Sequence, residues 1–223
     1  MLQILLGSIL LLNINTKEPM INKKYLALGD SYTIGESVSK SERYPNQLKT
    51  ELEKNNITLD AVDIIAKTGW TTDELSSAID EKNPKNDYDL VTLLIGVNNQ
   101  YRGRDSANYR KEFSDLLDRA IGFTTSKENV IVISIPDWGV TPFALQKGKD
   151  KLNIGQEIDN YNRINLEETL KRKVKYVDVT ELSRRAEKDK TLLADDGLHP
   201  SGKMYSLWVE DIFPIAKSIL EKK

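Results

Sequence analysis

Two continuous runs of apolar, mostly branched residues constrain the fold of this chain more than any other feature. The first is Leu90–Ile95 (LVTLLI), which is followed by Gly96, and the second is Val130–Ile135 (VIVISI), which is stopped by Pro136. Both runs have the length of a strand. A strand that is apolar along its whole length is typical of a parallel sheet that is covered on both faces. These runs therefore predict an α/β chain with helices on each side of a sheet.

Strand-like and helix-like segments alternate around these two runs. Further strands are predicted at 24–28, 59–65 and 174–179. Helical spacing of apolar residues predicts helices at 45–55, 72–79, 106–121, 154–170 and 204–220, and Pro214 is expected to bend or interrupt the last one. The charged stretches at 80–89 and 146–153 are expected to be loops. The alternation predicts a three-layer α/β/α sandwich around a central parallel sheet of about five strands.

The N-terminus differs in composition from the rest of the chain. Residues 1–16 carry no charge and resemble the apolar part of a signal peptide, but no Lys or Arg precedes them and no small-x-small cleavage site follows. The run is short for a membrane span, so no stable span is expected. The alternative is that Met20 is the true start. We therefore expect an apolar segment at 1–19 and one domain at 20–223, with localisation left open between cytoplasm and export.

Composition excludes several classes of protein. The 32 basic and 34 acidic residues leave a net charge of -2, which argues against a nucleic-acid binder. The chain has no cysteine, so thiol nucleophiles and disulfides are impossible. It has one histidine, His199, which cannot build a zinc site that needs two or three histidines. We expect no metal and no cofactor, and the oligomeric state stays open.

Four short motifs lie at predicted strand ends or in the loops beside them. They are Gly29–Thr33 (GDSYT), Thr68–Trp70 (TGW), Gly96–Asn99 (GVNN) and Asp195–Pro200 (DDGLHP). Each motif alone would also suit an ordinary turn. In open parallel sheets, however, the carboxyl ends of the strands share one edge, where ligands bind. The four motifs are therefore expected to meet there.

Together the motifs supply the parts for acyl transfer. The hydroxyl of Ser31 would attack a carbonyl carbon, and His199 would take its proton. Asp196, three residues before His199, would orient the imidazole. The backbone N–H groups of Ser31 and Gly69, with the side-chain amide of Asn98, would bind the oxyanion. Such a base should lose activity as it protonates in the mildly acidic range.

These motifs, in this order and spacing, resemble those of the GDSL/SGNH hydrolase superfamily, and in particular its lysophospholipase-L1-like esterase branch. The resemblance runs from about residue 23 to the last helix. It implies a flavodoxin-like fold, a Ser–His–Asp triad without a metal, and hydrolysis of esters or thioesters. The family spacing D-x-x-H favours Asp196 over Asp195 as the triad acid. The resemblance also makes the segment 135–143 a rim loop of the site.

Two residues beside the proposed triad are expected to support it. Asp30 is interpreted as a structural residue that binds neighbouring N–H groups. The third family motif usually reads G-x-N-D, and here Asn99 replaces the aspartate. Any supporting charge at that position is therefore missing, whereas the oxyanion role of Asn98 is kept.

The sequence leaves the substrate open. The main hypothesis is a small acyl ester, a thioester or a lysophospholipid. The alternatives are a carbohydrate O-deacetylase that uses the same site, or a carbohydrate-binding module that keeps the fold without turnover. Trp70, Trp138 and Trp208 could line a sugar or acyl groove, although packing in the core or rim is the favoured role for each.

Overall fold

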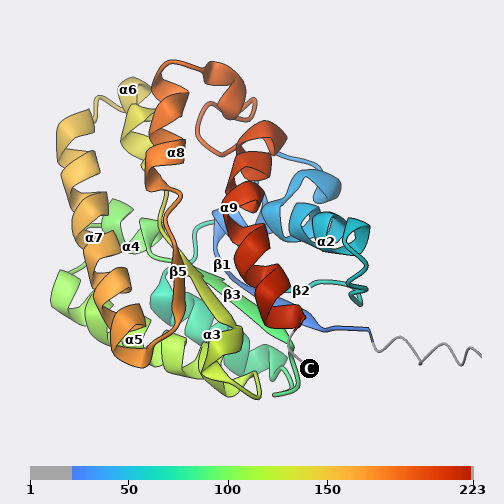
Figure 1. The fold of residues 1–223 in the computed structure, drawn as a ribbon. Helices are drawn as coiled ribbons and strands as arrows, with labels where there is room; N and C mark the ends of the chain where they lie inside the picture. The colour runs from blue at the N-terminus through green and yellow to red at the C-terminus, as the bar shows by residue number, and fades with distance from the viewer. Residues whose placement is uncertain (1–21, 222–223) are drawn as a thin grey trace, which may run out of the picture.

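Five parallel strands form the central sheet of the computed structural model, which describes residues 22–221 (Figure 1). The strand order is β2-β1-β3-β4-β5. The strands are β1 (Tyr25–Gly29), β2 (Asp63–Ala66), β3 (Leu90–Leu94), β4 (Val130–Ile133) and β5 (Lys175–Val177). The three central strands are buried along their whole length, as their apolar sequences predict.

Helices connect the strands and cover both faces of the sheet. They are α1 (Ser31–Ile34), α2 (Tyr44–Lys54), α3 (Thr72–Lys82), α4 (Val97–Tyr101), α5 (Ser106–Gly122), α6 (Pro142–Gln146), α7 (Lys151–Arg172), α8 (Thr180–Arg184) and α9 (Gly202–Leu220). Helices α2 and α9 pack together on one face, and α3, α5 and α7 pack in a row on the other. The predicted three-layer α/β/α sandwich is therefore confirmed.

The direction of the chain across the sheet explains the two helical layers. The connection from β1 to β2 runs toward one edge, whereas the later connections run toward the other edge. Because crossovers between parallel strands are right-handed, opposite directions place helices on opposite faces. The strand order thus reverses between β1 and β3. A crevice at the carboxyl ends of the strands is expected at this point.

The carboxyl ends of β1 and β3 lie level with each other. Gly29, the last residue of β1, pairs with Leu94, the last residue of β3. A Cβ at Gly29 would collide with the side chain of Thr33 and the carbonyl oxygen of Leu94. Gly96 has φ +130°, a conformation that residues with side chains rarely adopt. The two glycines therefore let both segments turn sharply at the same edge.

Several predicted boundaries are wrong, and each has a local reason. The strand predicted at 59–65 is formed only at 63–66, because Leu59 makes just an isolated bridge to Lys23. The strands predicted at 130–135 and 174–179 are also shorter, at 130–133 and 175–177. Helices α3 and α7 extend into the predicted loops, reaching Lys82 and starting at Lys151.

The last helix is continuous, contrary to the expected interruption at Pro214. Pro214 has no N–H to give to the carbonyl of Glu210, four residues earlier. Both residues lie on the exposed side of α9, where water can bind that carbonyl. The predicted N-terminal segment 1–19 lies outside the described residues, and the single domain at 20–223 stays a prediction.

Candidate active site

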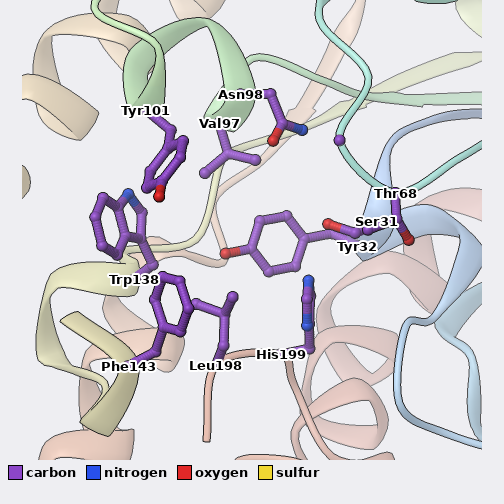
Figure 2. Close-up of a pocket in the computed structure, with 11 residues that line it drawn as sticks. Ser31, Tyr32, Thr68, Val97, Asn98, Tyr101, Trp138, Phe143, Leu198 and His199 are labelled. Atoms are coloured by element: carbon purple, nitrogen blue, oxygen red, sulfur yellow. The ribbon is translucent and has the colours of Figure 1, made fainter. Parts of the chain in front are cut away.

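The four predicted motifs converge at the sheet edge where the strand order reverses. Ser31 follows β1 directly, and Asn98 follows β3 as the second residue of α4. Gly69 lies in the loop between β2 and α3, and His199 lies in the loop before α9. These four residues line one cavity of about 190 Å³ (Figure 2). The structure thus brings together side chains that are up to 168 positions apart in the sequence (31 to 199).

Ser31 is the first residue of the short helix α1 and is almost fully buried. Asp30 is the N-cap, and its Oδ1 accepts a hydrogen bond of 3.0 Å from the backbone N–H of Tyr32. The other carboxylate oxygen of Asp30 has no hydrogen-bond partner among the described residues. Burial raises the pKa of Asp30 to about 7, and nearby backbone N–H groups only partly oppose this rise. Asp30 therefore shapes the turn and lies behind the cavity.

His199 is held by the carboxylate of Asp196. The distance from His199 Nδ1 to Asp196 Oδ2 is 2.6 Å. Oδ1 of Asp196 accepts the backbone N–H groups of Leu198 and His199, each at 2.9 Å. Partial burial opposes ionisation, but the hydrogen bonds from His199, Ser37 and the backbone lower the pKa of Asp196 to about 2. This carboxylate is therefore negative at neutral pH, and the adjacent Asp195 is exposed.

The bound carboxylate also decides which ring nitrogen of His199 carries a proton. An ionised carboxylate only accepts hydrogen bonds, so Nδ1 must donate to it. In the neutral ring, Nε2 is then left as the acceptor. The ring lies edge-on to Tyr32, with 5.7 Å between the ring centroids. Figure 2 shows the His199 ring directed toward the turn that carries Ser31.

Gly69 and Asn98 also border the cavity. Gly69 has φ +88°, and its carbonyl oxygen accepts a hydrogen bond of 2.6 Å from Arg102. One N–H of the Asn98 amide donates to the carbonyl of Trp70 at 2.9 Å, which fixes the orientation of the amide. An amide group carries two N–H donors, so one is left for a ligand.

Asn99 does not reach the cavity. It is fully buried, its Oδ1 accepts the N–H of Thr72 at 3.1 Å, and its Nδ2 donates to Thr72 Oγ1 at 2.7 Å. Thr72 Oγ1 in turn donates to Glu112. Because the Thr72 hydroxyl proton is already used, only a donor such as the Asn99 amide can bind that oxygen. This network ties α4 to the start of α3, next to the loop with Gly69.

A wall of apolar side chains closes the rest of the cavity. It consists of Tyr32, Val97, Tyr101, Trp138, Phe143 and Leu198. The ring of Trp138 meets Tyr101 and Phe143 edge-on, with centroid distances of 5.4 and 6.2 Å. Trp138 Nε1 donates to Gln100 Oε1 at 2.8 Å, which fixes the indole. Such a wall suits an apolar group better than a polar one.

The rim segment 135–143 contributes Trp138 and Phe143 to this wall. Asp137 orders the segment, since it accepts the N–H of Gly139 at 2.8 Å and binds Arg184 at 2.9 Å. Of the other tryptophans, Trp208 lies in the hydrophobic core, and Trp70 is partly buried and packs against that core. Sequence reasoning did not predict Tyr101. Its place two residues after the GVNN motif was the available signal.

Between residues 22 and 221, no three side chains of the His, Cys, Asp and Glu types cluster as metal ligands do. Within the same range, no helix has both the length and the apolar character that a bilayer crossing requires.

Comparison with known proteins gives a family and a fold. A sequence profile described as the GDSL-like Lipase/Acylhydrolase family matches residues 27–207, which include all of the predicted site residues. A search of curated proteins found no significant match.

Similar solved structures share the fold along most of their length. One is a lipase/acylhydrolase from Enterococcus faecalis, with a TM-score of 0.69, 19% identity, and 90% of this chain and 98% of that chain covered. A lipase from a goat rumen metagenome has a TM-score of 0.69, 20% identity, and coverage of 90% and 100%. A variant of an acetyl-xylooligosaccharide esterase from Geobacillus has a TM-score of 0.65, 18% identity, and coverage of 92% and 97%.

Proposed function

The chain belongs to the GDSL-like lipase/acylhydrolase family, and we propose that it hydrolyses acyl esters with Ser31 as nucleophile and His199 as base. One observation carries the proposal. Ser31 and His199 line the same cavity, and the far nitrogen of His199 is bound to the ionised carboxylate of Asp196. Acyl transfer by serine needs a nucleophile, a base and an acid that orients the base, and the placement of these three residues supports that assignment.

The proposed reaction follows from the proton positions. His199 Nε2 takes the hydroxyl proton while Ser31 Oγ attacks the ester carbonyl carbon. Asp196 stabilises the imidazolium that forms and remains ionised itself. The imidazolium then protonates the leaving alcohol, and the acyl group stays on Ser31. A water molecule, deprotonated by His199 in the same way, releases the acid and restores the serine.

Three N–H donors are proposed to stabilise the oxyanion. They are the backbone N–H of Ser31, the backbone N–H of Gly69 and the free amide N–H of Asn98. Each of these residues borders the cavity, and the Asn98 amide is already oriented by Trp70. Donors that are fixed before the reaction cost no reorganisation when charge develops.

The cavity wall supports an acyl group that is longer and more apolar than acetyl. A sugar platform needs an aromatic face that is open to the ligand. Trp138 is 3% exposed and is contacted by Tyr101 and Phe143, whereas Tyr101 itself is 48% exposed at the rim. These side chains would instead pack along an alkyl chain, each buried methylene adding about 0.8 kcal/mol. Sugar deacetylation is therefore the alternative that the test below can reveal.

The test compares p-nitrophenyl esters from acetyl to octanoyl with an acetylated xylo-oligosaccharide. The wild type is expected to hydrolyse the esters, with kcat/KM rising above acetyl, and Ser31→Ala to be inactive although folded. Trp138→Ala should flatten the dependence on chain length. If kcat/KM is highest for the acetyl ester and the sugar ester is turned over faster, the protein is a carbohydrate deacetylase and the acyl-ester proposal is wrong. An active Ser31→Ala variant would refute the mechanism.

A further inference from the structure

The turn after α1 is fastened to the backbone of the proposed nucleophile. The backbone N–H groups of Gly35 and Glu36 both donate to the carbonyl oxygen of Ser31, each at 3.0 Å. Gly35 and Ser37 have φ values of +68° and +63°. Such a φ is uncommon for a residue with a side chain and persists where surrounding contacts hold it. Contacts of the Ser37 side chain are therefore expected to hold this conformation.

Ser37 contacts the loop of the proposed acid and base. Its hydroxyl donates to Asp196 Oδ2 at 2.7 Å, across 159 positions of the chain. The same oxygen binds His199 Nδ1. With two backbone N–H groups on Oδ1, the carboxylate accepts four hydrogen bonds, which is about its full capacity. The Asp196 side chain is 29% exposed, so without the Ser37 hydroxyl its Oδ2 would bind exchanging water, which does not fix the position of the carboxylate.

The residue before Ser37 binds a second loop that borders the cavity. Glu36 accepts a hydrogen bond from Thr68, which borders the cavity beside Gly69. One turn thus joins the segment of the nucleophile to both neighbouring loops. Neither Glu36 nor Ser37 lines the cavity, so neither is placed to contact a substrate there.

We propose that Ser37 is a positioning residue for the reaction. Its hydroxyl holds the Asp196 carboxylate where it binds His199, and thereby couples the turn of Ser31 to the loop of the base. This inference rests on the proposed function, because it gives Ser37 a role through Asp196.

Four variants separate the hydroxyl from the backbone. Ser37→Ala and Ser37→Gly both lose the hydroxyl, but only glycine suits the positive φ. Ser37→Thr keeps the hydroxyl. Ser39→Ala is the matched control, since Ser39 is exposed and, among the described residues, its hydroxyl binds Ser41 and Glu42. Ser37→Ala and Ser37→Gly are expected to lower kcat equally, about tenfold, the scale of one lost hydrogen bond to a charged group. KM should not change, and Ser39→Ala should stay near wild type. Ser37→Thr should keep a higher kcat than Ser37→Ala because it retains the hydroxyl, although its branched Cβ strains the positive φ.

A second measurement does not depend on turnover. Because the chain has a single histidine, its ring N–H signal in a proton NMR spectrum needs no assignment by mutation. The downfield Nδ1–H signal should be present in the wild type and in Ser39→Ala. It should be shifted or lost by exchange in Ser37→Ala and Ser37→Gly.

Two results would overturn the inference. One is an unchanged kcat and an unchanged His199 signal in both Ser37→Ala and Ser37→Gly. The other is a loss in Ser37→Ala that Ser37→Gly restores, because backbone strain and not the hydroxyl would then explain it. An inactive wild type would instead refute the proposed function, and the NMR signal would still decide whether Ser37 positions the pair.

Discussion

Two aspartates flank the cavity, and their surroundings differ in nearly every respect. Asp30 is fully buried, and its Oδ2 has no hydrogen-bond partner within the described part of the chain. Asp196 is partly exposed, and each of its oxygens accepts two hydrogen bonds. The pKa of Asp30 is raised to about 7 by burial, whereas hydrogen bonds lower the pKa of Asp196 to about 2.

This difference separates a carboxylate that shapes the backbone from one that can serve the reaction. Full burial with few hydrogen-bond partners disfavours charge, so Asp30 is suited to cap α1 and not to stabilise a cation. A carboxylate held ionised beside an imidazole can stabilise the imidazolium. Two acidic residues next to the same cavity are thus expected to respond in opposite ways to mutation and pH.

The strongest loss of activity is expected at Asp196. Asp196→Asn keeps the shape but can present an N–H to His199 Nδ1, which favours the wrong tautomer. We expect kcat to fall by roughly 10³–10⁴-fold, measured with a short acyl ester. The matched control is Asp195→Asn, on the adjacent exposed residue, which should remain near wild type. Equal losses in the two variants would contradict the assignment of Asp196.

The second prediction concerns stability at Asp30. Its pKa is raised in the folded state, so its contribution is fully present below about pH 4 and is lost as the pH rises through about 7. Asp30→Asn cannot ionise and keeps an acceptor for the N-cap. At pH 8 this variant should be more stable than wild type by up to about 4 kcal/mol.

Urea unfolding of both proteins at pH 4 and pH 8 measures this effect. The advantage of Asp30→Asn should appear only at the higher pH. The same difference in unfolding free energy at both pH values would show that ionisation of Asp30 does not limit stability.

A smaller effect is expected at Asn98, which is one of the proposed oxyanion donors. Asn98→Ala removes one of three proposed oxyanion donors, and kcat should fall roughly 10²–10³-fold with little change in KM. Asn98→Asp has nearly the same size but no N–H and a repelling charge, so it should lose at least as much. Steady-state kinetics of both variants test this. An active Asn98→Asp enzyme would show that Asn98 does not act as an oxyanion donor.

The smallest effect is expected at Asn99, where the family motif usually has aspartate. Asn99→Asp would turn the donor toward Thr72 Oγ1 into an acceptor, while that hydroxyl already donates to Glu112. The buried mismatch should cost about 1–3 kcal/mol of unfolding free energy, with kcat nearly unchanged. Thermal or urea unfolding beside kinetics checks this. A gain in stability would mean that the network can accommodate the charge.

Much of the fold was predictable because the central strands are buried on both faces. The runs around β3 and β4 have no polar face, and Gly96 and Pro136 mark their ends. The short helices α1, α4, α6 and α8 were not predicted, because helices of four or five residues are too short to show a 3.6-residue period. The continuity of α9 through Pro214 depends on which side of the helix faces water. That side is set by tertiary packing and could not be predicted from the local sequence.

In the candidate site, too, some features could be predicted from the sequence and others could not. Ser31, Asn98 and His199 could be placed at one edge because parallel topology brings strand ends together. The contact of Ser37 with Asp196 spans 159 positions and follows no periodic pattern. The bond from Trp138 to Gln100 is likewise a tertiary contact, between the rim segment and α4. Such contacts depend on side-chain geometry, which local sequence does not determine.

The most direct test of the account is covalent labelling of Ser31 with a fluorophosphonate, followed by peptide mass mapping. We predict one adduct, on Ser31, in the wild type and equally in Ser39→Ala, with labelling strongly reduced in His199→Ala and absent in Ser31→Ala. Folded wild-type protein that takes up no label, or an adduct on another residue, would contradict the claim that His199 activates Ser31.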